Sequence, residues 1–118
     1  MSFGGLGLLE ANRGKLLVYA SNLASCRKRL KSVSAAAEKA ARTLNLDIEI
    51  VTLKSRAAPI YVYYKDGKEE PVPLYCDRNK KSSVKKVCSA LRSMMFVLSF
   101  HPKYSALRKI RKEIMRFS

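Results

Sequence analysis

The chain has 118 residues, of which 47% are hydrophobic, and it carries a formal net charge of +15 at pH 7. This length fits one compact domain with a hydrophobic core, and no stretch reaches the roughly 20 apolar residues of a membrane-spanning helix. The charge exceeds what solubility needs and predicts a polyanionic partner, either a nucleic acid or an anionic membrane surface. Residues 77–118 contain 12 Lys and Arg against 2 Asp and Glu, so the last third of the chain carries most of this charge.

The cysteines and the N-terminal residues bear on the cellular compartment in which the protein functions. Cys26, Cys76 and Cys88 are odd in number and form no CxxC pair. We therefore expect free thiols in a reducing compartment and not a disulfide framework. Residues 1–14 are rich in glycine and match neither a secretory signal nor an Arg- and Ser-rich transit peptide. A location in an organelle stays open, because an internal or uncleaved targeting signal leaves no such mark. We expect residues 1–14 to form a flexible arm.

The first half of the chain predicts a strand, a helix and a second strand. Residues 15–20 are a short apolar run typical of a buried strand. From Leu23 to Leu44 the apolar residues recur every three or four positions, which indicates a helix, and Asn45 is suited to its C-terminal cap. Charged and apolar residues alternate from Asp47, so residues 47–53 predict another strand. A strand, helix and strand of this length form a βαβ unit with parallel strands.

A β-hairpin follows. Residues 60–64 are β-branched or aromatic, which suits a half-buried strand. Asp66-Gly67 predicts a type I′ turn, because both residue types accept positive φ. The second strand contains Pro71 and Pro73, and proline cannot donate to a hydrogen-bond ladder, so this strand is predicted at an edge of the sheet.

Two further helices are predicted after the hairpin. The first spans residues 84–98, is capped by Ser82 or Ser83, and ends before a His-Pro pair. The second covers residues 103–118 and has an apolar stripe. This stripe can pack back on the domain, or it can lie on a protein while the surrounding cations contact phosphates. We favour the second arrangement because a domain of about 100 residues closes its core without this segment. A membrane-surface helix is a third possibility. The stripe consists of Leu107, Ile110, Ile114 and Phe117.

The order β-α-β-β-β-α predicts an α/β domain over residues 15–100, with one four-stranded mixed sheet and both core helices on one face or on both. The flexible arm, residues 1–14, precedes it, and a basic amphipathic helix over residues 101–118 follows it. This is the skeleton of a thioredoxin-like domain. Thiol redox chemistry is not expected, because Cys26 lies on the apolar stripe of its helix and has no resolving cysteine beside it.

Other reactive motifs are missing from the sequence. There is no Gly-rich phosphate loop between a strand and a helix, no His–Cys cluster with zinc spacing and no nucleophile beside a base. We therefore expect no catalytic residues, no metal, no cofactor and no small-molecule substrate. The only histidine, His101, is predicted to be a loop residue. A thiol enzyme is the alternative from another class, and replacing Cys26 with serine would test it.

From about Lys15 to Met95 the chain resembles the thioredoxin-like mitochondrial ribosomal proteins, which share a fold with the B-eight accessory subunit of respiratory complex I. The resemblance rests on Leu23-Ala24-Ser25-Cys26, on Leu44-Asn45-Leu46 and on the hairpin from Pro59 to Glu70. It implies a non-catalytic constituent of the large ribosomal subunit in the mitochondrial matrix, which binds ribosomal RNA and other mitochondrial ribosomal proteins. The alternative is an accessory structural subunit of complex I, which would not need so high a charge. The tail after Pro102 departs from the family pattern.

The candidate RNA contacts fall into three clusters of basic residues. Lys and Arg bind phosphates without reading sequence, and structured RNA is recognised mostly by shape and backbone. Each cluster could instead be a solvated surface. The first cluster, on the first helix, is Arg27, Lys28, Arg29 and Lys31; the second, at the start of the next helix, is Arg78, Lys80, Lys81, Lys85 and Lys86; the third, in the tail, is Arg108, Lys109, Arg111, Lys112 and Arg116.

Overall fold

The structure is a computed structural model that describes residues 14–21, 27–53, 59–77 and 83–117. Its element order confirms the predicted strand, helix, three strands and helix. The elements are β1 (Gly14–Ser21), α2 (Arg27–Leu44), β2 (Asp47–Leu53), β3 (Ile60–Asp66), β4 (Val72–Asp77), α3 (Val84–Leu98), α4 (Ser105–Lys109) and α5 (Arg111–Arg116).

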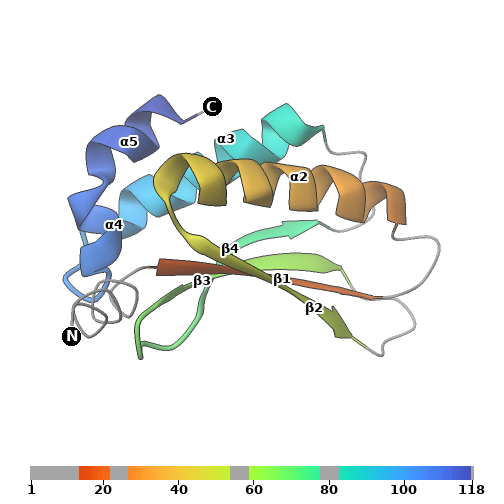
Figure 1. Cartoon of the computed structure of the whole chain (residues 1–118), viewed down its shortest axis with the longest axis horizontal. Coiled ribbons are helices and arrows are strands. Elements are labelled where there is room, and N and C mark those ends of the chain that lie inside the picture. The colour runs from red at the N-terminus through yellow and green to blue at the C-terminus, as the bar shows by residue number, and fades with distance from the viewer. Residues whose placement is uncertain (1–13, 22–26, 54–58, 78–82, 118) are drawn as a thin grey trace, which may run out of the picture.

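The four strands form one mixed sheet in the order β2-β1-β3-β4. β1 pairs with β2 in parallel, as the βαβ prediction requires, and with β3 in antiparallel orientation. Helices α2, α3 and α5 lie over one face of the sheet, and α4 lies at one end of it (Figure 1). The sequence left open whether the helices cover one face or both, and in the described residues they cover one.

The core lies between this face of the sheet and the helices. Alternate residues of the two central strands point into it and are at most 2% exposed. Helix α2 covers them with a stripe of alanines, whose small side chains let the helix lie close to the strands. The inward strand residues are Leu16, Val18 and Ala20 of β1 and Ile60, Val62 and Tyr64 of β3.

Two predicted helix caps are confirmed. Asn45 follows α2 with φ 56°, and the Leu46 N–H donates to the Ala41 carbonyl at 2.8 Å, which is the longer bond of a Schellman cap. Ser83 precedes α3, and its hydroxyl accepts from the Lys86 N–H at 3.2 Å. The predicted start of the first helix falls in residues 22–26, outside the described residues.

The hairpin is confirmed, but its predicted type I′ turn is wrong. Asp66 is the last residue of β3, and its carbonyl accepts from the Glu69 N–H at 2.9 Å. Gly67, with φ 56°, is the first central residue of the turn, and Lys68 does not have positive φ. This is the pattern of a type II′ turn. The turn is displaced by one residue because the Asp66 side chain is held inside the domain.

Asp66 links the hairpin to the tail. Its Oδ2 accepts from the Tyr64 hydroxyl at 3.0 Å and from the Ala106 N–H of α4 at 3.1 Å. Asp66 is 8% exposed and Tyr64 is fully buried. A Cβ on Gly14 would overlap the Tyr64 ring, so glycine is required where β1 begins.

The predicted edge position of the proline-containing strand is also confirmed, because β4 ends the sheet and contains Pro73.

The tail differs from its prediction in two ways. The single helix expected over residues 103–118 is divided into α4 and α5 at Ile110, where φ is −111° and ψ is 23°. The expectation that the apolar stripe lies on a partner is wrong, because Leu107, Ile114 and Phe117 are at most 1% exposed and belong to the core. The physical reason is that α3 and Tyr64 present apolar surface that the tail covers. The Tyr104 ring, for example, lies 6.0 Å from the Tyr64 ring, centroid to centroid.

Replacing Ile114 with alanine is expected to lower the free energy of unfolding by about 2–5 kcal/mol, because a fully buried side chain leaves a cavity. The neighbouring Met115 is 61% exposed, so Met115→Ala is the matched control and should change the free energy of unfolding by less than about 0.5 kcal/mol. Urea denaturation of the full chain measures both. Equal effects of the two substitutions would contradict a tail packed into the core.

The pKa of Tyr64 is raised, first by burial and then by the neighbouring Asp66 carboxylate. In the unfolded chain the phenol ionises near its ordinary value of 10.0, whereas in the folded chain it stays neutral. The resulting stabilisation is therefore complete below that pH and is lost as the pH rises above it. Burial also raises the pKa of the Cys88 thiol, which acts in the same direction.

The substitution Tyr64→Phe should accordingly reduce, without abolishing, the loss of stability at pH values above about 10. At neutral pH it should lower the free energy of unfolding by about 1–2 kcal/mol, because Asp66 loses a hydrogen-bond donor. Urea unfolding at a series of pH values measures both effects. An unchanged slope of stability against pH in the alkaline range would contradict the assigned role of Tyr64.

Candidate nucleic-acid interface

The charge of the described residues is divided between the two layers of the fold. The helices α2 to α5 contain fourteen Lys and Arg and two acidic residues, whereas the four strands contain two Lys and four acidic residues. Three of the four helices lie over the same face of the sheet and the fourth lies at its end (Figure 1). The cationic surface is therefore the helical side of the molecule.

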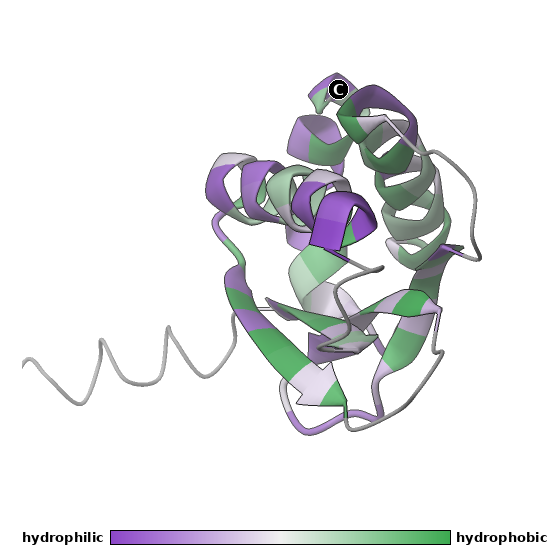
Figure 2. Cartoon of the chain, turned by 90° about the vertical axis from the view of Figure 1, so that its right-hand side faces the viewer, coloured by the Kyte–Doolittle hydropathy of each residue, from purple (hydrophilic) through white to green (hydrophobic). Residues whose placement is uncertain are grey.

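The first and second clusters lie at the same end of the molecule. Helices α2 and α3 lie side by side and both begin at the right-hand end of Figure 1, and Figure 2 looks onto that end. Arg29, near the start of α2, contacts Asp77, the last residue of β4: its Nη1 lies 3.2 Å from the Asp77 carbonyl oxygen and 3.6 Å from Oδ2. This contact joins the start of α2 to the strand that leads into α3. The exposed members described at this end are Arg27, Lys28, Lys31, Lys85 and Lys86.

Arg29 has a structural role. Its side chain is 18% exposed, and the Asp77 side chain is 1% exposed. A buried carboxylate is costly unless a cation compensates it, and Arg29 supplies that cation. We therefore separate Arg29 from the exposed members of its cluster.

The start of α3 combines side-chain cations with a helix N-terminus. Lys85 and Lys86 are exposed in its first turn, which contains no acidic residue. The N–H groups of a first helical turn favour anions, so phosphates near these lysines would meet a second source of positive potential. The other predicted members, Arg78, Lys80 and Lys81, lie outside the described residues.

The third cluster lies apart from the other two. Helix α4 is at the opposite end of the sheet, and α5 runs back over the helical layer (Figure 1). Arg111 points into the domain: its Nε donates to the Ser99 hydroxyl at 3.0 Å and its Nη2 to the Ser99 carbonyl at 2.9 Å. Its guanidinium carbon also lies 4.0 Å from the centroid of the Phe100 ring. Arg111 therefore ties α5 to the end of α3, and the exposed members of the cluster are Arg108, Lys109, Lys112 and Arg116.

Sequence reasoning missed part of this surface. Lys39 and Arg42 of α2 are exposed on the same helical layer. Their positions on the helix face opposite the buried alanines of α2 would have predicted this exposure from the sequence. The helical side also carries exposed apolar side chains, since Val97, Phe100 and Met115 are 58–63% exposed.

The remaining chemistry-bearing groups are dispersed. Cys88 is buried and Cys76 is exposed on β4, while Cys26 lies outside the described residues. Within the described ranges, no group of three or more His, Cys, Asp or Glu side chains could hold a metal ion. Among these same residues, no helix has the length and apolar character needed to cross a membrane.

Comparison with known proteins adds no relative. No protein-family model, no curated protein and no solved structure matches the chain.

Proposed function

We propose that this protein is a non-catalytic structural constituent of the large subunit of the mitochondrial ribosome, and that its helical side binds ribosomal RNA. The observation that carries the proposal is the division of charge between the two layers. A cationic layer of this kind attracts the phosphate backbone strongly and without sequence preference.

The arrangement of cations suits a structured RNA. Lysines from α2 and α3 converge at one end of the molecule, and the exposed cations of α4 and α5 lie elsewhere on the helical side. Contacts spread in this way position a protein across neighbouring backbone segments. Structured RNA is recognised largely through its shape and phosphates, so the interface needs no base-reading motif.

The resemblance to thioredoxin-like mitochondrial ribosomal proteins supports the choice of particle and compartment. Among them, the chain resembles large-subunit mitochondrial ribosomal protein fifty-three. The sheet order and the mixed strand directions accord with a thioredoxin-like βαβ-ββα domain. On this proposal the protein works in the mitochondrial matrix, among ribosomal RNA and other mitochondrial ribosomal proteins, and has no cofactor or small-molecule substrate.

The quadruple substitution of Lys28, Lys31, Lys85 and Lys86 with glutamine tests the interface. Binding to mitochondrial large-subunit ribosomal RNA should weaken at least tenfold, because each lysine that neutralises a phosphate contributes independently of sequence. The dependence of log K on log salt should also become shallower, by about 0.7–0.9 for each phosphate that the variant no longer neutralises. Filter binding or fluorescence anisotropy at several salt concentrations measures both quantities.

The matched control neutralises two lysines outside the helical layer, Lys65 of β3 and Lys68 of the hairpin turn. The double variant Lys65→Gln with Lys68→Gln should bind RNA within about twofold of the natural chain, because these lysines are remote from the proposed contacts. The proposal would be overturned if the control weakened binding per substituted lysine as much as the quadruple variant does. It would also be overturned if the quadruple variant bound RNA normally.

A further inference from the structure

The second face of the sheet has no covering layer in the described residues. Helices α2, α3 and α5 lie over the other face, and α4 lies at its end (Figure 1). All-parallel sheets have both faces covered, whereas an antiparallel sheet can leave one face in water when that face is polar. This mixed sheet has one parallel and two antiparallel pairs, so the composition of its second face decides whether that face needs a covering layer.

This uncovered face is apolar and aromatic at its centre. Tyr19 of β1 lies opposite Val51 of β2 and Tyr61 of β3 in the strand register. The Tyr19 and Tyr63 ring centroids are 5.4 Å apart with the rings nearly perpendicular, an edge-to-face arrangement. A shallow hollow of about 340 Å³ opens at this place, and it is lined by Tyr19, Leu53, Tyr61, Tyr63 and Pro71.

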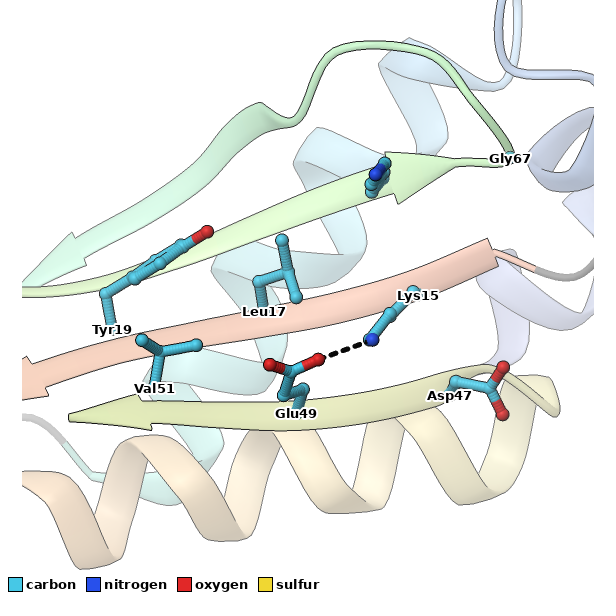
Figure 3. Close-up of a pocket in the computed structure, with 8 residues that line it drawn as sticks. Lys15, Leu17, Tyr19, Asp47, Glu49, Val51 and Gly67 are labelled. Carbon is cyan, nitrogen blue, oxygen red and sulfur yellow. Dashed lines mark ion pairs between the residues drawn. The ribbon is translucent and has the colours of Figure 1, made fainter.

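A second hollow of about 330 Å³ adjoins the first along β1 and β2. Figure 3 shows Leu17, Tyr19 and Val51 on the same side of the strands as the charged residues of this hollow. Lys15 and Glu49 form an ion pair there, and its hydrogen bond raises the pKa of Lys15. The charged residues that line the hollow are Lys15, Lys65, Asp47 and Glu49. Their formal charges cancel, so this face lacks the positive potential of the helical side.

We propose that the uncovered face, defined by the partly exposed residues Tyr19, Val51, Leu53, Tyr61 and Tyr63, is a docking surface for an amphipathic helix of another protein. The apolar stripe of this helix lies along β1 and β3 and places a large apolar side chain in the tyrosine-lined hollow. The inference rests on the fold and on this face, and not on the RNA contacts proposed for the opposite side.

The charge of this face favours a helix of another protein over a polyanion or a second copy of the chain. A polyanion is disfavoured because the formal charges that line this face cancel and leave no positive potential to attract it. A second copy of the chain is disfavoured because each copy carries +15, so the two repel each other. A near-neutral patch whose centre is rich in tyrosine and poor in charge matches the core of protein interfaces. A helix is the fitting element because it satisfies its own backbone hydrogen bonds and completes the second layer of the sheet.

Site-specific photo-crosslinking in the cells that make the protein tests the occupant. The full chain carries p-benzoylphenylalanine in place of Tyr63, and a second version carries it in place of Lys31 on the helical side. The Tyr63 position should form a nuclease-resistant crosslink to one protein, at a segment whose apolar residues recur every three or four positions. Crosslinks from Tyr63 to RNA, to lipid, to a second copy or to residues 1–13 of the same chain would each overturn the inference, and so would the absence of a crosslink.

The two positions report on different proposals. A crosslink from Lys31 to ribosomal RNA supports the proposed function, and its absence would count against that function alone. The result at Tyr63 decides the docking surface in either case.

A synthetic peptide with the sequence of the crosslinked segment then measures the contribution of the tyrosines. Tyr61→Ser should weaken peptide binding at least tenfold, whereas Phe100→Ser, at an exposed aromatic residue on the helical side, should change it less than twofold. Urea unfolding of both variants verifies that the domain remains folded. Equal weakening by the two substitutions in folded protein would overturn the inference.

Discussion

Packing of α2 against the inward residues of β1 and β3 is the interaction on which the rest of the structure depends. The alanine stripe of α2 can lie close to the strands only if its long basic side chains point away from the sheet. The same requirement acts on α3, whose buried side includes Val87, Leu91 and Met95. Burial of the apolar stripes therefore places the cations together on the helical side.

The second consequence concerns the other face of the sheet. Because the helices occupy one side, the outward residues of β1 and β3 have no layer above them in the described chain. At the centre of this face they are Tyr19, Tyr61 and Tyr63, next to the paired Lys15 and Lys65, whereas a water-facing sheet surface is usually polar throughout. The fold thus has two chemically distinct sides, a cationic one suited to phosphates and an aromatic one suited to a protein neighbour. A ribosomal constituent that lies between RNA and protein would use both.

The sequence predicted the sheet, the two long helices and two of their caps, because these depend on local periodicity and on cap residues such as Asn45 and Ser83. It did not predict that the tail packs into the domain's own core, because the apolar stripe of Leu107 and Ile114 could equally pack against a partner. The turn was misplaced for a similar reason: Asp66 is held by Tyr64 and by Ala106, which is 40 residues away in the sequence. Arg29 and Arg111 were grouped with exposed cations because their partners, Asp77 and Ser99, are also recognised only in three dimensions.

The central proposal is that this domain belongs to a ribonucleoprotein particle held largely by charge. Sedimentation of a mitochondrial lysate through gradients of increasing salt tests it most directly. The account predicts that the protein migrates with the large ribosomal subunit at low salt and is released only at high ionic strength, as phosphate contacts are screened. Migration with a respiratory complex, or with no large particle at low salt, would contradict it.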